Sequence, residues 1–309
     1  MALSLTEAAK LSNDVLRVGV IETVVKESPV LQYMPFIEVL GNGLTYNREN
    51  AMATAAFYAV ADTWAESTPT FTQVTVGLKI LGGDADIDNY LKVTRSNIQD
   101  IEAATLELKA KAVAHKFEDS FLYGSSGTDP NSFDGLHLNI AAGQQIHVGS
   151  GTTPAALSMG NMDSLLDLIK PGKPDVLICS RRTRRGFNKL SRAANSPFSV
   201  DLNRMGERIQ FYNGVPIGVS DFALDTEILA SGAFSAATGG ASSSVFAMKF
   251  GEDGVCGLQA TNGIEVQPVG NLETKDATRY RVKWYCNYAL FSKLAVAKID
   301  GISSADMTN

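Results

Sequence analysis

The clearest pattern in the chain is an alternation of apolar and polar residues in FTQVTVGLKILGG, residues 71–83. A period of two predicts a β-strand. The apolar residues that share one face of this strand are Val74, Val76, Leu78 and Ile80. A second strand is predicted over GLTYNREN, residues 43–50.

The connection between these two strands is unusually long. It has about 20 residues, AMATAAFYAVADTWAESTPT, whereas hairpin loops usually have about 2–5. Either the hairpin continues outward on both arms, or an ordered loop rests on another surface. Aromatic side chains on such a projection would be poorly buried within one subunit. We predict an extended hairpin that packs on a neighbouring subunit through Phe57, Tyr58, Trp64 and Phe71.

A helical period predicts a long helix over residues 97–123. One apolar face consists of Ile98, Ile101, Leu108, Ala112 and Leu122. A second face consists of Leu106, Ala110, Val113, Phe117 and Phe121. Because both faces are apolar, we expect this helix to be covered on two sides.

The N-terminal segment also has a helical pattern. Ser4 and Glu7 have the spacing of a capping box, and an apolar stripe continues to residue 25. An extended segment follows from Pro29. This arrangement is equally consistent with an arm that reaches away from the body and with an ordinary first helix.

The remaining pattern predicts mixed helices and strands. Helices are predicted over residues 159–170 and 181–194, and a buried strand over residues 174–180. Residues 207–224 predict two strands joined by a turn at Asn213–Gly214. Residues 230–244 are small and of low complexity, which predicts a mobile loop, and three or four strands follow. Without regular βαβ alternation, the fold class is α+β.

Composition favours a folded cytosolic protein. The apolar fraction is 45% and the charged fraction 19%, and the formal net charge is −6. The three cysteines lie far apart and form no metal-ligand or disulfide pattern. No secretory signal and no apolar run of membrane-spanning length is present, so we expect no contact with a membrane.

One short stretch is strongly basic despite the acidic total. The cations in SRRTRRGFNKLSR, residues 180–192, are Arg181, Arg182, Arg184, Arg185, Lys189 and Arg192. On a helix most of them lie along one side. Three interpretations stay open: nonspecific binding of nucleic acid, a patch that meets an acidic surface of another subunit, or a solvated helix face.

Residues that could carry catalysis show no recognisable arrangement. Asp84, Asp86 and Asp88 have the spacing of half a calcium loop, but the glycine and the distal glutamate of such a loop are missing. The histidines, at positions 115, 137 and 147, are not at ligand spacing, and no nucleophile elbow or phosphate-binding loop occurs. We therefore predict no catalytic, cofactor or metal site.

The order of these elements resembles that of a known family. A long two-stranded excursion, a long helix and an FDGL turn at Phe133–Leu136 precede the strand pair NGVPIGVSD and the ending ALFSKLAVAKIDG. This succession resembles the major capsid proteins of tailed bacteriophages, whose Hong Kong 97-like fold is also used by encapsulin shells. The resemblance extends over nearly the whole chain, and it rests on order and spacing more than on any single motif.

The resemblance implies a division into four parts. Residues 1–40 would form an N-terminal arm, and residues 41–85 an extended loop that lies over the adjacent subunit. Residues 86–140 and 265–309 would form a peripheral domain around the long helix. Residues 141–264 would form an axial domain. Gly41 and Gly43 on one arm, and Gly82 and Gly83 on the other, would act as hinges of the extended loop.

The resemblance also implies a function without catalysis. Copies of the chain would assemble into an icosahedral shell of pentamers and hexamers around a double-stranded DNA genome, as part of a virion assembled in the host cytoplasm. Since no scaffolding domain precedes the arm, we expect either a separate scaffold protein or none, and portal and decoration proteins are further candidate partners. Because no lysine occurs between Glu49 and Val76, we expect assembly without covalent crosslinks.

Two alternatives are open at this point. The first is an encapsulin compartment, which has the same architecture and encloses cargo enzymes. The second, from another class, is a soluble hydrolase that uses His137.

Overall fold

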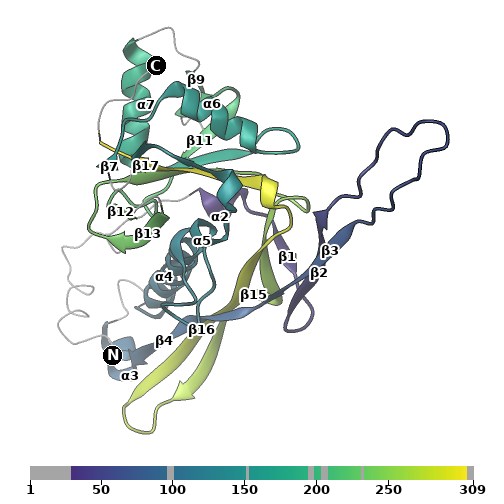
Figure 1. Cartoon of the computed structure of the whole chain (residues 1–309). Coiled ribbons are helices and arrows are strands. Elements are labelled where there is room, and N and C mark those ends of the chain that lie inside the picture. Colours follow the sequence, from purple (N-terminus) through teal and green to yellow (C-terminus); the bar gives the residue numbers. More distant parts are fainter. Residues whose placement is uncertain are drawn as a thin grey trace.

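The computed structural model has an α+β fold, as predicted (Figure 1). It describes residues 29–95, 101–150, 153–193, 198–202, 208–230 and 233–304. The helical pattern of residues 4–28, and with it most of the predicted arm, lies outside these ranges.

The larger sheet has seven strands in the order β5-β17-β14-β8-β11-β10-β9. Their bounds are β5 Gln145–His147, β8 Val176–Cys179, β9 Phe198–Leu202, β10 Arg208–Tyr212, β11 Val215–Val219, β14 Ser243–Met248 and β17 Val296–Ile302. The predicted buried strand is β8. The predicted strand pair is β10 and β11, joined where Asn213 and Gly214 both have positive φ angles, as a tight hairpin turn requires.

Both faces of this sheet are covered. In β8, Leu177 and Cys179 pack with helices α6 (Met159–Leu168) and α7 (Arg181–Ala193) on one face. The neighbouring residues Val176 and Ile178 point to the other face and join the core around helix α4 (Ile101–Tyr123). Every residue of β8 is therefore buried, which explains the continuous apolar run in its sequence.

The second sheet has four strands in the order β1-β15-β16-β4. Their bounds are β1 Phe36–Glu38, β4 Lys79–Asp88, β15 Val255–Asn271 and β16 Ala277–Leu290. Alternate residues of β16 from Val282 to Leu290 are buried toward α4. The ring of Phe117 on α4 lies 4.7 Å from that of Trp284, measured between centroids. This sheet is therefore held against the helix largely by aromatic packing.

Helix α4 is covered on two sides near its C-terminal end, where Leu122 of the first predicted face and Phe121 of the second are both buried, but its middle is covered on one side only, which corrects the expectation there. Val113, Phe117 and Phe121 are buried between the two sheets. On the opposite side Leu108 is 40% exposed and Ala112 is also exposed. The sheets enclose the face of α4 that has the larger side chains. At Leu108 and Ala112, the opposite face is partly open to solvent within one chain.

Two backbone segments cross side by side from one sheet to the other. Strand β14 leads into β15, and β16 leads into β17. The Lys249 N–H donates to the Ala295 carbonyl (2.9 Å), and the Phe291 N–H donates to the Gly254 carbonyl (2.9 Å). Because each segment is bonded to the other, the two sheets are joined by a double crossover.

The double crossover divides the chain differently from the predicted domain boundaries. Residues 265–309 were assigned together to the part around the long helix. In the structure β16 joins the four-stranded sheet, but β17 lies inside the seven-stranded sheet between β5 and β14. The boundary at residue 264/265 also falls within β15, which is one continuous strand.

The prediction of a mobile loop over residues 230–244 is wrong. Ala233–Thr238 forms strand β13, which pairs with β12 (Glu227–Ala230), and β14 begins at Ser243. Ser242, Ser243 and Ser244 are fully buried. Their hydroxyl groups are satisfied inside the protein, for example by a hydrogen bond from Ser244 to the Glu227 carboxyl group (2.6 Å). Small polar residues here serve close packing rather than flexibility.

The predicted hairpin is present as β2 (Gly43–Ala51) and β3 (Thr70–Gly77), which pair antiparallel. The alternation expected from 71 to 83 is interrupted at Leu78, where β3 ends and β4 begins at Lys79. Consequently Ile80 is 76% exposed instead of sharing the face of Val74 and Val76.

The remaining described elements are short. They are α2 Val30–Tyr33, α3 Asn89–Arg95, α5 Leu136–Asn139, β6 Gly149–Ser150, β7 Thr153–Pro154, and the 3-10 turns at Ala142–Gln144 and Lys293–Ala295. Within the part of the chain that the structure describes, no helix is both long and apolar enough to cross a membrane.

The one-sided burial of the middle of α4 predicts different effects of substitutions on its two faces. Phe117→Ala removes a fully buried ring and should lower the free energy of unfolding by about 3–5 kcal/mol. Leu108→Ala, on the exposed face, should lower it by less than about 1 kcal/mol. Denaturant unfolding of the unassembled chain measures both, and equal effects would contradict the packing described here.

Candidate assembly surfaces

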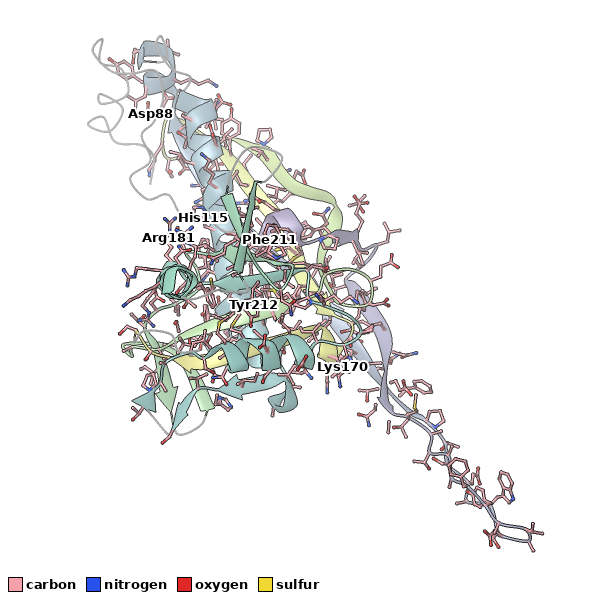
Figure 2. All side chains as sticks on the ribbon, turned by 90° about the horizontal axis from the view of Figure 1, so that it is seen from above. Asp88, His115, Lys170, Arg181, Phe211 and Tyr212 are labelled. Atoms are coloured by element: carbon pink, nitrogen blue, oxygen red, sulfur yellow. The ribbon has the colours of Figure 1, made fainter. Side chains whose placement is uncertain are left out.

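The ribbon, residues Gly43–Gly77, projects from the body and carries exposed apolar side chains. Figure 1 shows β2 and β3 leaving the four-stranded sheet and a long loop continuing beyond them. In Figure 2 the ribbon extends away from the end of the molecule where Asp88 lies. It therefore has no core of its own along its outer half.

The predicted contact residues lie on this ribbon. Phe57 is 108% exposed, Trp64 77% and Phe71 67%, and Met52 and Val60 are also exposed. Tyr58 differs, because its ring stacks on Trp64 at a centroid distance of 4.5 Å and is only partly exposed. The structure thus confirms the expected poor burial of Phe57, Trp64 and Phe71. For Tyr58 the expectation is wrong, because this side chain is partly buried. Whether these residues contact another subunit stays a prediction.

The tip of the ribbon is a defined turn. The Ala59 N–H donates to the Asp62 carboxylate (2.6 Å), and the Asp62 N–H donates to the Ala59 carbonyl (3.2 Å). The Ala65 N–H donates to the Tyr58 hydroxyl (3.1 Å). These bonds order the loop locally although neither sheet covers it.

The base of the ribbon is anchored to the end of β16. Arg48 on β2 donates through Nε to the Phe291 carbonyl (3.0 Å) and through Nη2 to the Leu290 carbonyl. The Tyr46 hydroxyl donates to the same Leu290 carbonyl (2.7 Å), and its ring packs edge-on against Phe291 at 4.9 Å. We call Tyr46 and Arg48, with these two carbonyl groups, the anchor.

The predicted glycine hinges are only partly suited to that role. Gly82 lies in the β4–β16 ladder opposite Lys283, and a Cβ atom there would lie 2.4 Å from the Val282 carbonyl oxygen. Gly83 is also in the ladder. These two glycines allow close strand packing and are not hinges. On the other arm, Gly41 has a φ of +112° and open space around it.

The basic run forms helix α7 as predicted, but its cations do not act as one patch. Arg181 makes a two-pronged ion pair with Asp221, with Nη2 2.9 Å from Oδ2. Arg182 is mostly buried, lies 3.4 Å from Asp225, and donates to the Ala241 carbonyl. These two arginines hold the helix to its own chain.

Further exposed cations of α7 lie about one turn along from Arg181. Arg184 and Arg185 are exposed and make no ion pair with a described residue. Lys189 is exposed as well. The side chain of Arg192 lies outside the described part.

Comparison with known proteins fits this arrangement of parts. A model of the phage capsid family matches residues 11–300, which is nearly the whole chain. The chain belongs to the phage capsid family. No curated protein sequence matches it.

Solved shell proteins have the same fold as this capsid protein. The SrpI encapsulin complex of Synechococcus elongatus aligns with a TM-score of 0.72 and 18% identity, over 100% of this chain and 99% of that chain. The capsid of an empty GTA particle aligns with a TM-score of 0.68 and 14% identity, over 97% and 98%. Microbacterium phage Oxtober96 aligns with a TM-score of 0.65 and 15% identity, over 99% of each chain. Because these sequence identities are only 14–18%, the comparisons show a shared fold and nothing more.

The acidic triplet of this capsid protein is occupied by structural contacts. Asp84 pairs with Arg281 (Nε to Oδ1, 2.7 Å) and Asp86 with Arg279 (2.6 Å). Asp88 accepts the backbone N–H groups of Tyr90 and Leu91 and so caps α3. The sequence pattern that resembles half of a calcium loop is therefore part of strand β4, and two of its carboxylates are paired with arginines of the neighbouring strand.

His137 is unsuited to the hydrolase alternative. It is buried against the Lys298 ammonium group, with Nδ1 3.2 Å from Nζ. Burial, together with the nearby Lys298 charge, lowers the pKa of His137 to about 2. The ring therefore stays neutral and cannot deliver a proton at neutral pH. The phage capsid family is structural, so this alternative is wrong.

The same region holds a buried carboxyl group, that of Glu227, which lies near the Lys298 charge but forms no ion pair with a described residue. Glu227 is hydrogen bonded to the Tyr123 hydroxyl at the end of α4 (2.5 Å) and to the Ser244 hydroxyl of β14 (2.6 Å). Burial raises the pKa of Glu227 to about 8. At neutral pH it is therefore mostly protonated, so its O–H donates one of these two hydrogen bonds and the other carboxyl oxygen accepts, and it bridges the long helix to the larger sheet as a neutral group.

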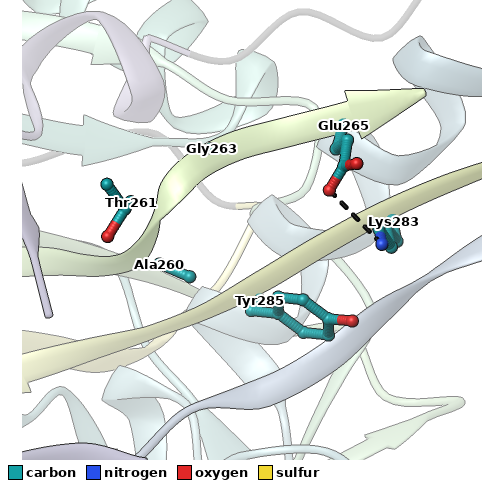
Figure 3. A pocket seen from close by; sticks show the side chains of 6 residues that line it. All are labelled: Ala260, Thr261, Gly263, Glu265, Lys283 and Tyr285. Atoms are coloured by element: carbon teal, nitrogen blue, oxygen red, sulfur yellow. Dashed lines mark ion pairs between the residues drawn. The ribbon is translucent and has the colours of Figure 1, made fainter. Parts of the chain in front are cut away.

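A small depression lies on the four-stranded sheet (Figure 3). Its volume is about 200 Å³, and it is lined by Ala260, Thr261, Gly263, Glu265, Lys283 and Tyr285. Glu265 and Lys283 form an ion pair across it (3.3 Å). The two charged groups that line this depression are therefore paired with each other.

Sequence reasoning did not identify the anchor or the Glu227 site. Tyr46 and Arg48 are two apart on a predicted strand, so they share a face, and that spacing could have suggested a joint role. Nothing local marks Glu227, because its partners Tyr123 and Ser244 lie far away in the chain.

The Glu227 site predicts a specific pH dependence of stability. Between pH 4.5 and about 8 the folded chain holds a proton that the unfolded chain has released, so stability should fall as pH rises through this window. Glu227→Gln keeps a neutral hydrogen-bonding group at every pH and should remove this slope, which amounts to a few kcal/mol. Denaturant midpoints of both proteins from pH 5 to 9 measure the difference.

The exposed Glu252 provides the matched control, since Glu252→Gln should leave the profile unchanged. If wild type and Glu227→Gln have parallel profiles across the whole range, Glu227 does not hold the proton.

Proposed function

We propose that this capsid protein assembles into an icosahedral shell of pentamers and hexamers that encloses a double-stranded DNA phage genome. The family match over residues 11–300 supports a phage-type shell. The observation that carries the assembly proposal is the ribbon, whose Phe57 and Trp64 are exposed within one chain. Permanent assemblies bury large apolar interfaces, so a projecting apolar segment suits a shell subunit.

The exposed side of α4 supports the same proposal. Leu108 is 40% exposed and Ala112 is also exposed on the middle of the long helix within one chain. In a closed shell each copy can cover such surfaces of its neighbours, and similar contacts recur around every symmetry axis. The capsid would act in the virion after assembly in the host cytoplasm, together with separate scaffold, portal and decoration proteins.

Assembly would not involve covalent crosslinks through the ribbon. The outer ribbon has no lysine, and Lys79, at its base, donates to the Pro130 carbonyl of its own chain (3.0 Å). A noncovalent shell that is boiled in detergent should release the 33.0 kDa chain as a single band.

Two of the exposed cations of helix α7, Arg184 and Arg185, suit either a neighbouring subunit or packaged DNA. Since Arg181 and Arg182 are paired within the chain, Arg184 and Arg185 carry the free positive charge of the described helix. A small number of phosphate contacts of this kind would be nonspecific and salt-dependent.

An encapsulin-type compartment is the second candidate. The observation in its favour is the structural likeness to the Synechococcus elongatus SrpI encapsulin complex, with a TM-score of 0.72. Purified particles distinguish the two, since a phage capsid should contain long DNA and an encapsulin should contain cargo protein.

The ribbon proposal predicts loss of assembly without loss of folding. The double variant Phe57→Ser and Trp64→Ser removes apolar groups that are each worth roughly 1.5–3 kcal/mol when buried at an interface. Particle yield should fall at least tenfold in negative-stain microscopy, because each subunit loses this contact. Circular dichroism should be unchanged, since neither side chain is in a core.

The control is Phe57→Tyr with Trp64→Tyr, which keeps aromatic surface and should retain most particles. Normal shells from the serine variant would contradict a role of the ribbon in assembly. A wild-type chain that stays a monomer under assembly conditions would contradict the proposed function itself.

The exposed cations give a second test of the shell. Arg184→Glu with Arg185→Glu should lower either particle yield or DNA content, because two positive charges per subunit become negative. Particle counts and the ratio of absorbance at 260 and 280 nm separate the subunit contact from the DNA contact. The control with lysine at both positions should give the wild-type result. If the glutamate variant forms particles at normal yield with normal DNA content, Arg184 and Arg185 contact neither a subunit nor DNA and simply face solvent.

A further inference from the structure

The anchor of the ribbon attaches at a particular place in the fold. Leu290 is the last residue of β16 and pairs with Val255, the first residue of β15. The next residue, Phe291, donates its N–H to the Gly254 carbonyl (2.9 Å). The two carbonyl groups that Arg48 binds therefore belong to the double crossover between the two sheets.

The chemistry of the anchor makes it sensitive to the orientation of that crossover. An arginine presents its N–H groups in a rigid plane, so two bonds to consecutive carbonyl groups fix both its position and its direction. Charge-assisted hydrogen bonds of this kind are stronger than neutral ones. If the two sheets rotate relative to each other, the Leu290 and Phe291 carbonyls turn with the crossover, and the guanidinium must follow or release.

The rest of the ribbon's base does not provide a free pivot on both arms. Gly82 and Gly83 are held in the β4–β16 ladder. The Asn287 side chain donates to the Gly77 carbonyl (2.6 Å), which holds the end of β3. Only the arm that contains Gly41 has an open glycine with a positive φ among these residues.

From this arrangement we infer that Arg48, supported by Tyr46, is a positioning residue that couples the angle of the ribbon to the relative arrangement of the two sheets. A change in sheet arrangement in one subunit would then redirect the ribbon toward its neighbour. The biological meaning of this coupling rests on the proposed function, because the angle matters only where ribbons contact other copies.

Hydrogen exchange measured by mass spectrometry tests the coupling on the unassembled full chain. In Arg48→Ala, amides of β2 and β3 should exchange about tenfold or more faster, because a charge-assisted bond pair is lost. Amides of α4 should be unchanged. Arg48→Lys should give an intermediate result, since an ammonium group is a single point donor without the planar fork.

Arg281→Ala is the matched control. It removes an arginine in a two-pronged ion pair with Asp84 on the four-stranded sheet, away from the anchor, and should leave ribbon exchange at the wild-type rate. Tyr46→Phe, which deletes one hydroxyl group, provides a milder variant if Arg48→Ala does not fold. It should raise ribbon exchange severalfold.

Ribbon exchange at the wild-type rate in Arg48→Ala would overturn the inference. Faster exchange throughout the chain, α4 included, would also overturn it, because Arg48 would then only stabilise the fold. These results do not depend on particle formation. Failure of the wild type to form shells would count against the proposed function, and the exchange data would still decide the role of Arg48.

Discussion

The double crossover between the two sheets is the constraint on which the rest of the structure depends. Lys249 and Ala295 are hydrogen bonded across it, as are Phe291 and Gly254, so neither connection can move without the other. The core around Phe117 fills the space that this arrangement leaves between the sheets. Both sheets are covered in this way, and the ribbon remains outside as the described segment with the most exposed aromatic side chains, those of Phe57, Trp64 and Phe71.

Many polar groups of the body are also satisfied within the chain. Charges near the body are paired within the chain, as in Asp86–Arg279 and Arg181–Asp221. The buried Glu227 is accommodated by hydroxyl groups and a proton instead of a counter-ion. Large apolar side chains, among them Trp64 and Leu108, remain exposed in one chain, and burial of apolar surface is the main driving force of protein association. A shell subunit needs this combination of a self-sufficient body and an incomplete surface.

Local pattern predicted the elements well and their environments less well. The period of two predicted β3, and the continuous apolar run predicted β8. Asn213–Gly214 predicted the turn between β10 and β11. Each of these signals lies within a few residues. The errors involve partners distant in sequence. Ser242–Ser244 were predicted as part of a loop because their packing depends on Glu227 and Thr183. The residues of β17 were assigned to the part around the long helix, although β17 lies in the seven-stranded sheet, because no local pattern marks the crossover. The anchor was missed because Arg48 and Leu290 meet only in the folded chain.

Cryo-electron microscopy of particles assembled from the wild-type chain tests the central claim most directly. The account predicts closed shells in which the Phe57 and Trp64 side chains of each copy are buried against a neighbouring copy, while Arg48 stays bound to the crossover of its own chain. Particles in which the ribbon folds back and is covered by its own chain, or in which Trp64 remains in solvent, would contradict the account.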